Sequence, residues 1–365
     1  MHVLILGGTR YFGRAAARQL LESGHRVTIF SRGRVRPPFW KDIEFVQGDR
    51  QDADGLVQQL AGRSFDGVID NLCFNRQEAE GVIRALQGQV GRYVVASTVS
   101  VYGEGGHARV RHTVRESLTE EERFAVDYRY REPVRESDLD NANQPWEYRP
   151  HLSPYGEGKR QMERVMLESP ADWPFIIVRV PATLGPGDPS GRFPWWLSRI
   201  MDGDPVLVPD GGTLAVQVGY SNDLATFLIK LFTHGGTRTV YNYAQPEMPA
   251  LINWLQAVAE AARRPLHPVS VPAEMLQRYT DLPWQDWSYA PFTYCPLLMS
   301  TSKAEAEVGL DFRVSLRDWV QTTVDAYLQE PAGLEHATDA GLRAQEVQFA
   351  RKWADLKVRL GELLR

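Results

Sequence analysis

The chain has 365 residues, of which 43% are apolar, 24% charged and 10% aromatic, values typical of a globular protein rather than a disordered or fibrous one. Its 41 basic and 46 acidic residues give a formal net charge of −5, which disfavours a dedicated nucleic-acid-binding protein because such proteins usually carry a basic surface. Two cysteines, no signal peptide and no apolar run of about 18 residues predict a cytoplasmic protein without a disulfide framework or a membrane partner.

The first thirty residues predict a strand, a glycine-rich turn, a helix and a second strand. Residues 2–6 form an apolar run typical of a central parallel strand, residues 14–22 are strong helix formers, and residues 25–30 form the second strand. The turn between strand and helix consists of Gly7, Gly8, Thr9, Arg10, Tyr11, Phe12 and Gly13. Such a turn can hold a pyrophosphate on the free amides of the helix start. It predicts dinucleotide binding, and the alternative is a strand-turn-helix unit with no ligand.

The residues after the second strand favour NADP over NAD as the cofactor. NAD usually calls for an Asp or Glu at this strand end, to bind the ribose hydroxyls, but this chain has Ser31, Arg32 and Arg34 there. Arginine suits a 2′-phosphate through charge-assisted, forked hydrogen bonds, and Arg10 would add a third cationic contact. The alternative is that these arginines simply face solvent.

Four further strands are expected near residues 43–46, 66–70, 92–96 and 175–179, with helices between them near residues 52–62 and 75–90. This alternation predicts a Rossmann-like α/β fold with a doubly wound parallel sheet. Ligands gather at the carboxyl ends of the strands in such sheets, and small or polar residues follow each expected strand.

Two later segments carry a resemblance to a known family. Residues 95–103 read Val-Ala-Ser-Thr-Val-Ser-Val-Tyr-Gly, and residues 153–163 contain a Tyr-x-x-x-Lys pair. Together with the turn at residues 7–13, they resemble the extended, atypical short-chain dehydrogenase/reductases, which form the NAD-dependent epimerase/dehydratase family, over about residues 1–330. The resemblance implies an NAD(P)-dependent oxidoreductase or epimerase/dehydratase. Such an enzyme moves a hydride at a secondary alcohol or ketone of a sugar-like or other small polar substrate.

The resemblance also implies that Thr98, Tyr155 and Lys159 are the catalytic residues. Tyr155 and Lys159 are four residues apart, on one helix face. The pKa of free tyrosine, near 10, is too high for a base at neutral pH, and we expect the ammonium and the nicotinamide ring to lower it by about three units. Tyr155 would then exchange a proton with the substrate oxygen, Thr98 would bind that oxygen, and Lys159 would bind the nicotinamide ribose. The alternative is an ordinary helix-start tyrosine and a solvated lysine.

Further cofactor contacts are implied by the same resemblance. Asp49 aligns with the family's adenine-binding Asp and is followed by Arg50, while Leu72 and Cys73 align with a loop that lies along the cofactor. For Cys73 we favour the role of a small buried apolar residue over thiol chemistry. Two more contacts complete the expected cofactor site: Ser97 and Val180.

Three departures from the family pattern bear on the substrate. Arg10 replaces the middle glycine of the turn, which resembles atypical members, including reductase-like proteins and a plant branch that binds RNA. That branch lacks the catalytic pair that this chain keeps. Nucleotide-sugar members usually have an Asn near Ala182 and an Arg near Val216, and this chain has neither. A diphosphate would then need Arg192 or Arg199 as its clamp, so the substrate need not be a nucleotide sugar.

We predict a nucleotide-binding domain over residues 1–183, to which residues 222–243 and 313–330 return, and a substrate-binding lobe over residues 184–220 and 244–312. The charged stretch at residues 104–150 is either a lid or interaction loop or a solvated excursion.

Aromatic residues are expected to contribute to substrate binding in the smaller lobe. Tyr102, Trp195 and Trp196 are candidates together with Arg192, and residues 284–294 resemble the rim of a pocket. The alternative is that these aromatic residues are core. Residues 331–365 should form an amphipathic helix that packs on the body or on a partner. Eight histidines without metal-ligand spacing predict no metal.

Two functional alternatives remain open on the sequence. One is an NADPH-dependent reductase of a non-sugar carbonyl. The other is a nucleotide-sensing or RNA-associated binding protein on the same fold, although net acidity and the Tyr-Lys pair argue against nucleic acid. Family resemblance also predicts a homodimer through the helix of Tyr155 and that near residues 75–90, whose apolar faces could equally be internal core.

Overall fold

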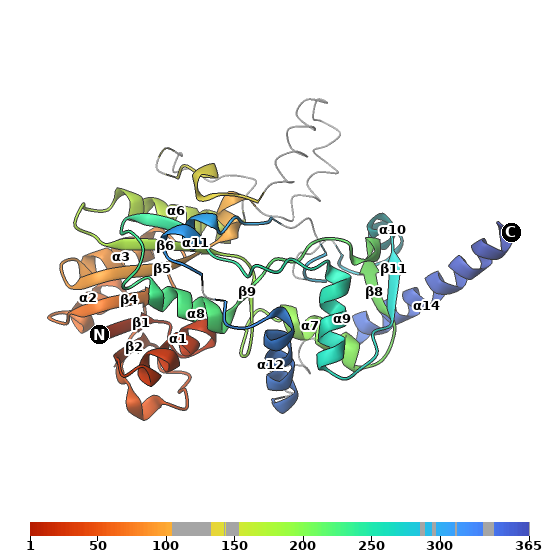
Figure 1. Cartoon of the computed structure of the whole chain (residues 1–365), viewed down its shortest axis with the longest axis horizontal. Helices are drawn as coiled ribbons and strands as arrows, with labels where there is room; N and C mark the ends of the chain where they lie inside the picture. Colours follow the sequence, from red (N-terminus) through yellow and green to blue (C-terminus); the bar gives the residue numbers. More distant parts are fainter. Residues whose placement is uncertain are drawn as a thin grey trace.

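The computed structural model describes residues 1–103, 133–141, 143, 153–284, 289–293, 297–310, 312–330 and 339–364. Figure 1 shows a layered α/β lobe that contains the N-terminus and a smaller lobe from which the C-terminal helix extends. Most of the charged stretch predicted at residues 104–150 lies outside the described residues, which include only its residues 133–141 and 143.

A parallel seven-stranded sheet forms the centre of the larger lobe. Its order is β10-β6-β5-β4-β1-β2-β3, and each neighbouring pair is parallel. The strands are β1 (His2–Leu6), β2 (Arg26–Ser31), β3 (Glu44–Gln47), β4 (Phe65–Asp70), β5 (Val90–Thr98), β6 (Phe175–Val180) and β10 (Thr239–Asn242). All six expected strands are present, and the predicted Rossmann-like fold is confirmed. The sequence pattern did not indicate β10, which extends the sheet beyond β6.

Helices cover both faces of this sheet. Val3 and Ile5 of β1 belong to one apolar core and Leu4 and Leu6 to the other, which explains why the strand is apolar at every position. The first core also receives α1 (Tyr11–Glu22), α8 (Ser221–Lys230) and α11 (Ser302–Glu307). The second receives α2 (Ala53–Leu60), α3 (Arg76–Leu86) and α6 (Pro154–Glu168). Helices α3 and α6, expected at a dimer interface, pack against each other, and the dimer stays a prediction.

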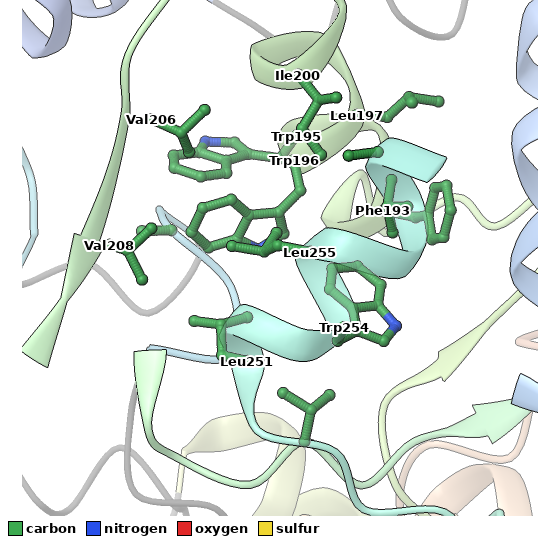
Figure 2. Packing of buried hydrophobic residues seen from close by; sticks show 14 of the residues in the cluster. Phe193, Trp195, Trp196, Leu197, Ile200, Val206, Val208, Leu251, Trp254 and Leu255 are labelled. Atoms are coloured by element: carbon green, nitrogen blue, oxygen red, sulfur yellow. The ribbon is translucent and has the colours of Figure 1, made fainter. Parts of the chain in front are cut away.

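The smaller lobe has an aromatic core of its own. Figure 2 shows Phe193, Trp195, Trp196 and Trp254 packed together between helices and a short strand. Its elements are β7 (Thr183–Leu184), α7 (Arg192–Met201), β8 (Val206–Pro209), β9 (Gly219–Tyr220), α9 (Leu251–Ala261), β11 (Pro268–Val271), α10 (Ala273–Tyr279), α12 (Leu316–Gln329) and α14 (Ala340–Leu363).

The structure differs from the expected domain division at two C-terminal helices. Helix α12 was expected to return to the nucleotide-binding domain, but Trp319, Val320 and Val324 pack in the core of the smaller lobe. Conversely, α11 lies within the stretch expected in the smaller lobe, yet Ala304 and Val308 pack in a core of the larger one. Helical periodicity shows that one face is buried, but it carries no information about which lobe buries it.

None of the helices in the described part of the chain combines the length and apolarity needed to cross a bilayer. The same residues contain no group of three or more His, Cys, Asp or Glu side chains arranged to hold a metal ion.

Candidate active site

The glycine-rich turn between β1 and α1 requires two of its glycines. Gly7 has a φ of 93°, a value that side-chain-bearing residues rarely adopt, and Leu72 packs where its Cβ would be. A Cβ on Gly13 would overlap the carbonyl oxygen of Gly7 and the Asn71 side-chain amide. A Cβ on Gly8 would lie 2.9 Å from the side chain of Ile29 in β2. The backbone of the turn is thus held close to the carboxyl end of the sheet.

Asn71 is a polar residue beside this turn that the sequence analysis did not select. It follows β4, and both polar atoms of its side chain are buried without a hydrogen-bond partner in the described structure. Buried amides normally find partners, so an unpaired amide against Gly13 is suited to a polar ligand. The glycine cradle and this amide fit the pyrophosphate region of a dinucleotide, and only its place after a strand could have identified Asn71.

The other residues of the turn point in different directions. Thr9 is partly exposed, and Arg10 is exposed at the N-terminus of α1. Tyr11 has a φ of 54°, and its ring lies 5.0 Å from that of Phe12. Burial raises the pKa of the Tyr11 phenol well above its ordinary value, and a hydrogen bond with Thr183 opposes this shift. Tyr11 therefore connects the turn to the smaller lobe.

The arginines after β2 are exposed. The guanidinium groups of Arg32 and Arg34 have no hydrogen bond or ion pair with any other residue in the described ranges. Ser31 accepts a hydrogen bond from the Gly33 amide at 3.3 Å, which shapes this loop. By contrast, Arg36 lies over the ring of Trp40 at 5.2 Å. Arg32 and Arg34 are therefore accessible to a phosphate.

Arg50 differs from these arginines because it is buried in an ion pair. Its Nη1 lies 2.5 Å from Oδ2 of Asp70, and its Nη2 donates to the carbonyl of Glu78 at 3.1 Å. This guanidinium binds the ends of β4 and α3 together and has little capacity left for a cofactor. Asp49 is exposed, and its carboxylate accepts from the Gln51 amide at 3.0 Å.

The loop after β4 combines a packing residue with an inert thiol. Leu72 contacts the turn at Gly7. Cys73 is fully buried in the core, and burial raises the pKa of its thiol to about 12. A thiol with that pKa stays protonated at neutral pH and is a poor nucleophile. Cys73 is therefore a packing residue, as favoured from the sequence.

The three expected catalytic residues meet where β5 ends and α6 begins. Ser153 caps α6 by accepting from the Gly156 amide at 3.1 Å, which places Tyr155 in the first turn and Lys159 one turn later. The side chain of Tyr155 is 47% exposed, and that of Thr98 forms a hydrogen bond with it. Lys159 is buried, and its Nζ donates to the carbonyl of Ala96 at 2.7 Å.

Phe74 lies between the two helix residues and was missed by the sequence analysis. Its ring centroid is 4.7 Å from the Nζ of Lys159 and 6.3 Å from the ring centroid of Tyr155. At 40% exposed, it is an unusually accessible phenylalanine. Its position after Leu72 and Cys73, at the same strand end, was the available signal.

The pKa values in this group differ from the expectation. Burial raises the pKa of Tyr155 above its ordinary value, whereas Thr98 and the charge of Arg192 oppose that rise. Burial lowers the pKa of Lys159 to about 8. The expected lowering of the tyrosine pKa by the lysine is thus absent in the protein alone, because the ammonium is bonded to a strand carbonyl and is itself poorly solvated.

A buried carboxylate connects α6 to the strands beside it. Glu163 lies on the same face of α6 as Tyr155 and Lys159, two turns after the first and one after the second. It accepts hydrogen bonds from Ser97 at 2.6 Å, from Asn141 at 2.5 Å and from Arg179 at 2.7 Å. Ser97 is therefore committed to Glu163. The spacing of four residues was visible in the sequence, but it does not reveal which partners the carboxylate meets.

Tyr102 belongs to the same network and is a weaker candidate for substrate contact. Its hydroxyl accepts from Arg179 and donates to Asn242, both at 2.8 Å. Burial raises its pKa to about 12. Val180, at the end of β6, is also nearly buried.

The two arginines considered as a phosphate clamp have different environments. Arg192 begins α7, and its charge acts on the phenols of Tyr155 and Tyr11, so it is near the expected reaction centre. Arg199 is buried, pairs with Glu346 at 2.6 Å and lies over the ring of Trp195. It holds α14 to the lobe and is not an available clamp.

The expectation that Trp195 and Trp196 bind substrate is corrected by the structure. Both are buried in the aromatic core (Figure 2), and Trp196 donates to the carbonyl of Pro291 at 2.9 Å. Trp284 and Tyr289, expected at a pocket rim, are also core residues, while residues 285–288 and 294 lie outside the described ranges. The core of the smaller lobe needs large apolar side chains to fill it, and this explains why the tryptophans and Tyr289 are buried there.

Comparison with known families agrees with this geometry. Residues 7–142 match an NAD(P)H-binding domain, and residues 75–244 match the NAD dependent epimerase/dehydratase family. The chain is thus similar to the NAD-dependent epimerase/dehydratase family over these residues. Structures similar to it include epimerases and dehydratases, and a reductase is among its relatives. These similarities support an NAD(P)-binding fold.

Two relatives and one solved structure illustrate the range of proteins to which the chain is similar. The chain is 26% identical over 277 residues to the chloroplast stem-loop binding protein of 41 kDa b from Arabidopsis thaliana, covering 72% of this chain and 64% of that protein. It is 26% identical over 283 residues to 2′-dehydrokanamycin reductase from Streptomyces kanamyceticus, covering 75% and 70%. The dTDP-glucose 4,6-dehydratase of Bacillus anthracis, solved with NAD, has 14% identity and a TM-score of 0.66, with 93% and 100% covered. That last likeness concerns the fold.

Proposed function

We propose that this protein transfers a hydride between NAD(P) and a secondary alcohol or ketone of a sugar-like or other small polar substrate, with Tyr155 as the acid/base. The observation that carries the proposal is the convergence of Thr98, Tyr155 and Lys159 where β5 ends and α6 begins. The loop after β4 lies next to them through Phe74 and packs against the turn at residues 7–13 through Leu72. An accessible phenol that is hydrogen-bonded to a threonine hydroxyl provides two hydrogen-bond donors for a substrate oxygen.

The residues of the chain fit a dinucleotide, which when bound supplies the carbon that takes or gives the hydride. The turn at residues 7–13, the Asn71 amide and Lys159 would hold it. Tyr155 then gives a proton to the substrate oxygen from its Oη in reduction, or takes one in oxidation. Thr98 orients that oxygen through its hydroxyl. Burial raises the pKa of Tyr155 in the protein alone, so at neutral pH its phenol is in the neutral, proton-donating form.

The cofactor is proposed to be NADP rather than NAD. Arg32 and Arg34 are exposed and unpaired among the described residues, and no carboxylate lies at the end of β2 to bind ribose hydroxyls. Paired guanidinium groups bind a phosphate monoester strongly, whereas they have no charge to neutralise on a ribose hydroxyl.

Two observations favour a substrate other than a nucleotide sugar. Position 216, where an arginine would grip a diphosphate, is a buried valine, and Arg199 is held by Glu346. The charge of Arg192 acts on the Tyr155 phenol. The curated relative that reduces an aminoglycoside ketone by name, 2′-dehydrokanamycin reductase, supports the narrower reading of an NADPH-dependent reductase.

A second candidate function, binding of an RNA stem-loop, is favoured by the name of the chloroplast relative. The net charge of −5 opposes it, because RNA binding needs phosphate neutralisation. The accessible Tyr155 beside Thr98 also favours the enzyme.

The test begins with the cofactor. Freshly purified protein is denatured and any released nucleotide is identified by mass spectrometry, after which empty protein is titrated with NADPH and NADH. We expect preferential NADPH binding. A carbonyl panel that includes keto-sugars is then incubated with NADPH deuterated at C4, and deuterium in the product identifies the substrate class.

Each outcome decides between the candidates. Stoichiometric retained cofactor with no net oxidation would favour a redox-neutral epimerase or dehydratase. Salt-sensitive binding of a stem-loop RNA, without binding of either dinucleotide, would replace the enzyme with the second candidate.

A further inference from the structure

The last dozen residues of helix α14 leave an apolar face uncovered. Its first half is fixed to the smaller lobe, where Val347 and Ala350 are buried and Glu346 pairs with Arg199. Contact with the body ends near Trp353, whose indole donates to the carbonyl of Ser270 at 3.0 Å. Beyond that residue the helix extends away from both lobes (Figure 1).

The exposed side chains after Trp353 form a stripe. Leu356 and Leu360 are each 45% exposed, and Leu363 and Leu364 are more than 80% exposed. Spacings of three and four residues place them on one side of a helix. Val358 is also exposed but falls off this stripe. A row of leucines in water is costly, so a surface that covers it would be favoured.

Basic side chains border this stripe on both sides. Helical geometry places Lys352 and Arg359 along one edge and Lys357 along the other, while Asp355 and Glu362 fall on the opposite side of the helix. Residues 351–365 contain five basic and two acidic residues, although the whole chain is acidic. The covering surface should therefore be negatively charged where it meets the edges of the stripe.

This charge pattern excludes a second copy of the helix as the best partner. In a coiled coil of two such helices, the residues beside the apolar seam face each other. Lys352 would then meet Lys357 in a parallel pair, or Arg359 in an antiparallel pair, and like charges in these positions repel. The two edges also lack an acidic residue that could compensate.

We propose that the end of α14, residues 352–364, binds the surface of an anionic lipid bilayer. The leucines would enter the boundary between headgroups and acyl chains. The long stems of Lys352, Lys357 and Arg359 would lie along that boundary with their charges at lipid phosphates. The acidic residues of the opposite side would face water. Since the helix extends from the body, repulsion between the acidic body and the lipid is screened over about 8 Å at physiological salt.

The proposal modifies the expectation of no membrane partner, because it concerns contact with one surface rather than a span. It does not depend on the proposed enzyme function. A tethered enzyme would meet substrates at or near a membrane, but lipid binding can be measured whether or not the protein has a dehydrogenase activity.

The experiment is co-sedimentation of the full chain with two kinds of vesicle, phosphatidylcholine alone and phosphatidylcholine mixed with phosphatidylserine. We expect binding to the anionic vesicles and its loss at high salt.

The variant Leu356→Gln/Leu360→Gln should not bind. The variant Lys352→Gln/Arg359→Gln should lose about tenfold or more in affinity for these vesicles. The matched control is Val358→Gln, which removes an exposed apolar side chain off the stripe and should bind like the parent. All these side chains are exposed, so the fold is retained, which circular dichroism verifies.

Three results would overturn the proposal. One is equal binding to neutral and anionic vesicles, or to neither. Another is a dimer in light scattering that Leu360→Gln dissociates, which would make the stripe a self-association surface. The third is binding to an acidic polypeptide such as polyglutamate without binding to anionic vesicles, which would indicate an acidic protein partner.

Discussion

The two lobes differ in how many of their candidate site residues are exposed. In the larger lobe, Arg32, Arg34 and Tyr155 lie at strand ends or at a helix start and are exposed. In the smaller lobe, Arg199 and Trp196 are buried and hold helices together. A parallel sheet puts its strand ends at one edge, so chain position indicates where ligand-binding side chains gather, although Arg50 after the end of β3 is buried in an ion pair. The described part of the smaller lobe has only two-stranded parallel sheets, so the sequence there does not indicate whether an arginine or tryptophan faces the core or a ligand.

Replacement of Tyr155 should have the largest effect among the tests of this difference between exposed and buried residues. Tyr155→Phe should lower turnover about 100-fold to 10,000-fold, the range for loss of a general acid or base, with NADPH affinity retained. The measurement is cofactor oxidation on the substrate found by deuterium transfer. Tyr279→Phe, at a tyrosine that is 63% exposed, is the matched control and should be neutral. Full activity in Tyr155→Phe would remove Tyr155 from the mechanism.

The aromatic core of the smaller lobe should respond in stability rather than in recognition. Trp196→Ala should lower the free energy of unfolding by about 3–5 kcal/mol, the range for large-to-alanine changes in a core. Urea denaturation measures this, and KM is then compared at a temperature where the variant is folded. An increased KM with unchanged stability would restore the substrate role that burial argues against.

Buried Lys159 predicts a pH dependence of stability in the larger lobe. Its pKa is 10.5 in the unfolded chain and about 8 in the fold, so the unfolded state binds more protons between those values and stability rises with pH there. Below pH 8 the full cost, about 3 kcal/mol, is present.

Lys159→Met should therefore be more stable than the parent at pH 7.5, and this advantage should shrink toward pH 10. Denaturant titrations of both proteins at the two pH values measure the difference. A constant difference would show that the lysine is not desolvated as the structure indicates.

The smallest expected effect concerns cofactor choice. Arg32→Ser/Arg34→Ser should weaken NADPH binding about tenfold, since each exposed guanidinium–phosphate pair contributes up to about 1 kcal/mol, and should leave NADH binding nearly unchanged. Fluorescence titration measures both. Arg36→Ser, which removes the guanidinium beside Trp40, serves as control. Equal loss for both cofactors would refute the assignment of these arginines to a 2′-phosphate.

The fold and much of the candidate site could be predicted because they rest on local signals. The turn at residues 7–13 follows an apolar run and precedes helix formers, and the Tyr-x-x-x-Lys pair has helical spacing. What could not be predicted depends on long-range packing. Asp70 neutralises Arg50 from another strand, and Glu163 meets Ser97, Asn141 and Arg179 from three segments. No spacing within the sequence identifies such partners.

The position of β10 at the sheet edge has a consequence for how the molecule assembles. Residues 239–242 pair with β6, at residues 176–179, across the interval that contains α7, β8 and α8. Strands β1 to β6 can therefore pair as soon as they are synthesised, whereas the hydrogen bond that Tyr102 donates to Asn242 must wait for about sixty further residues. Contacts so distant in sequence are slow to form. During synthesis, the glycine turn should thus be ordered before the polar network around Arg179 is complete.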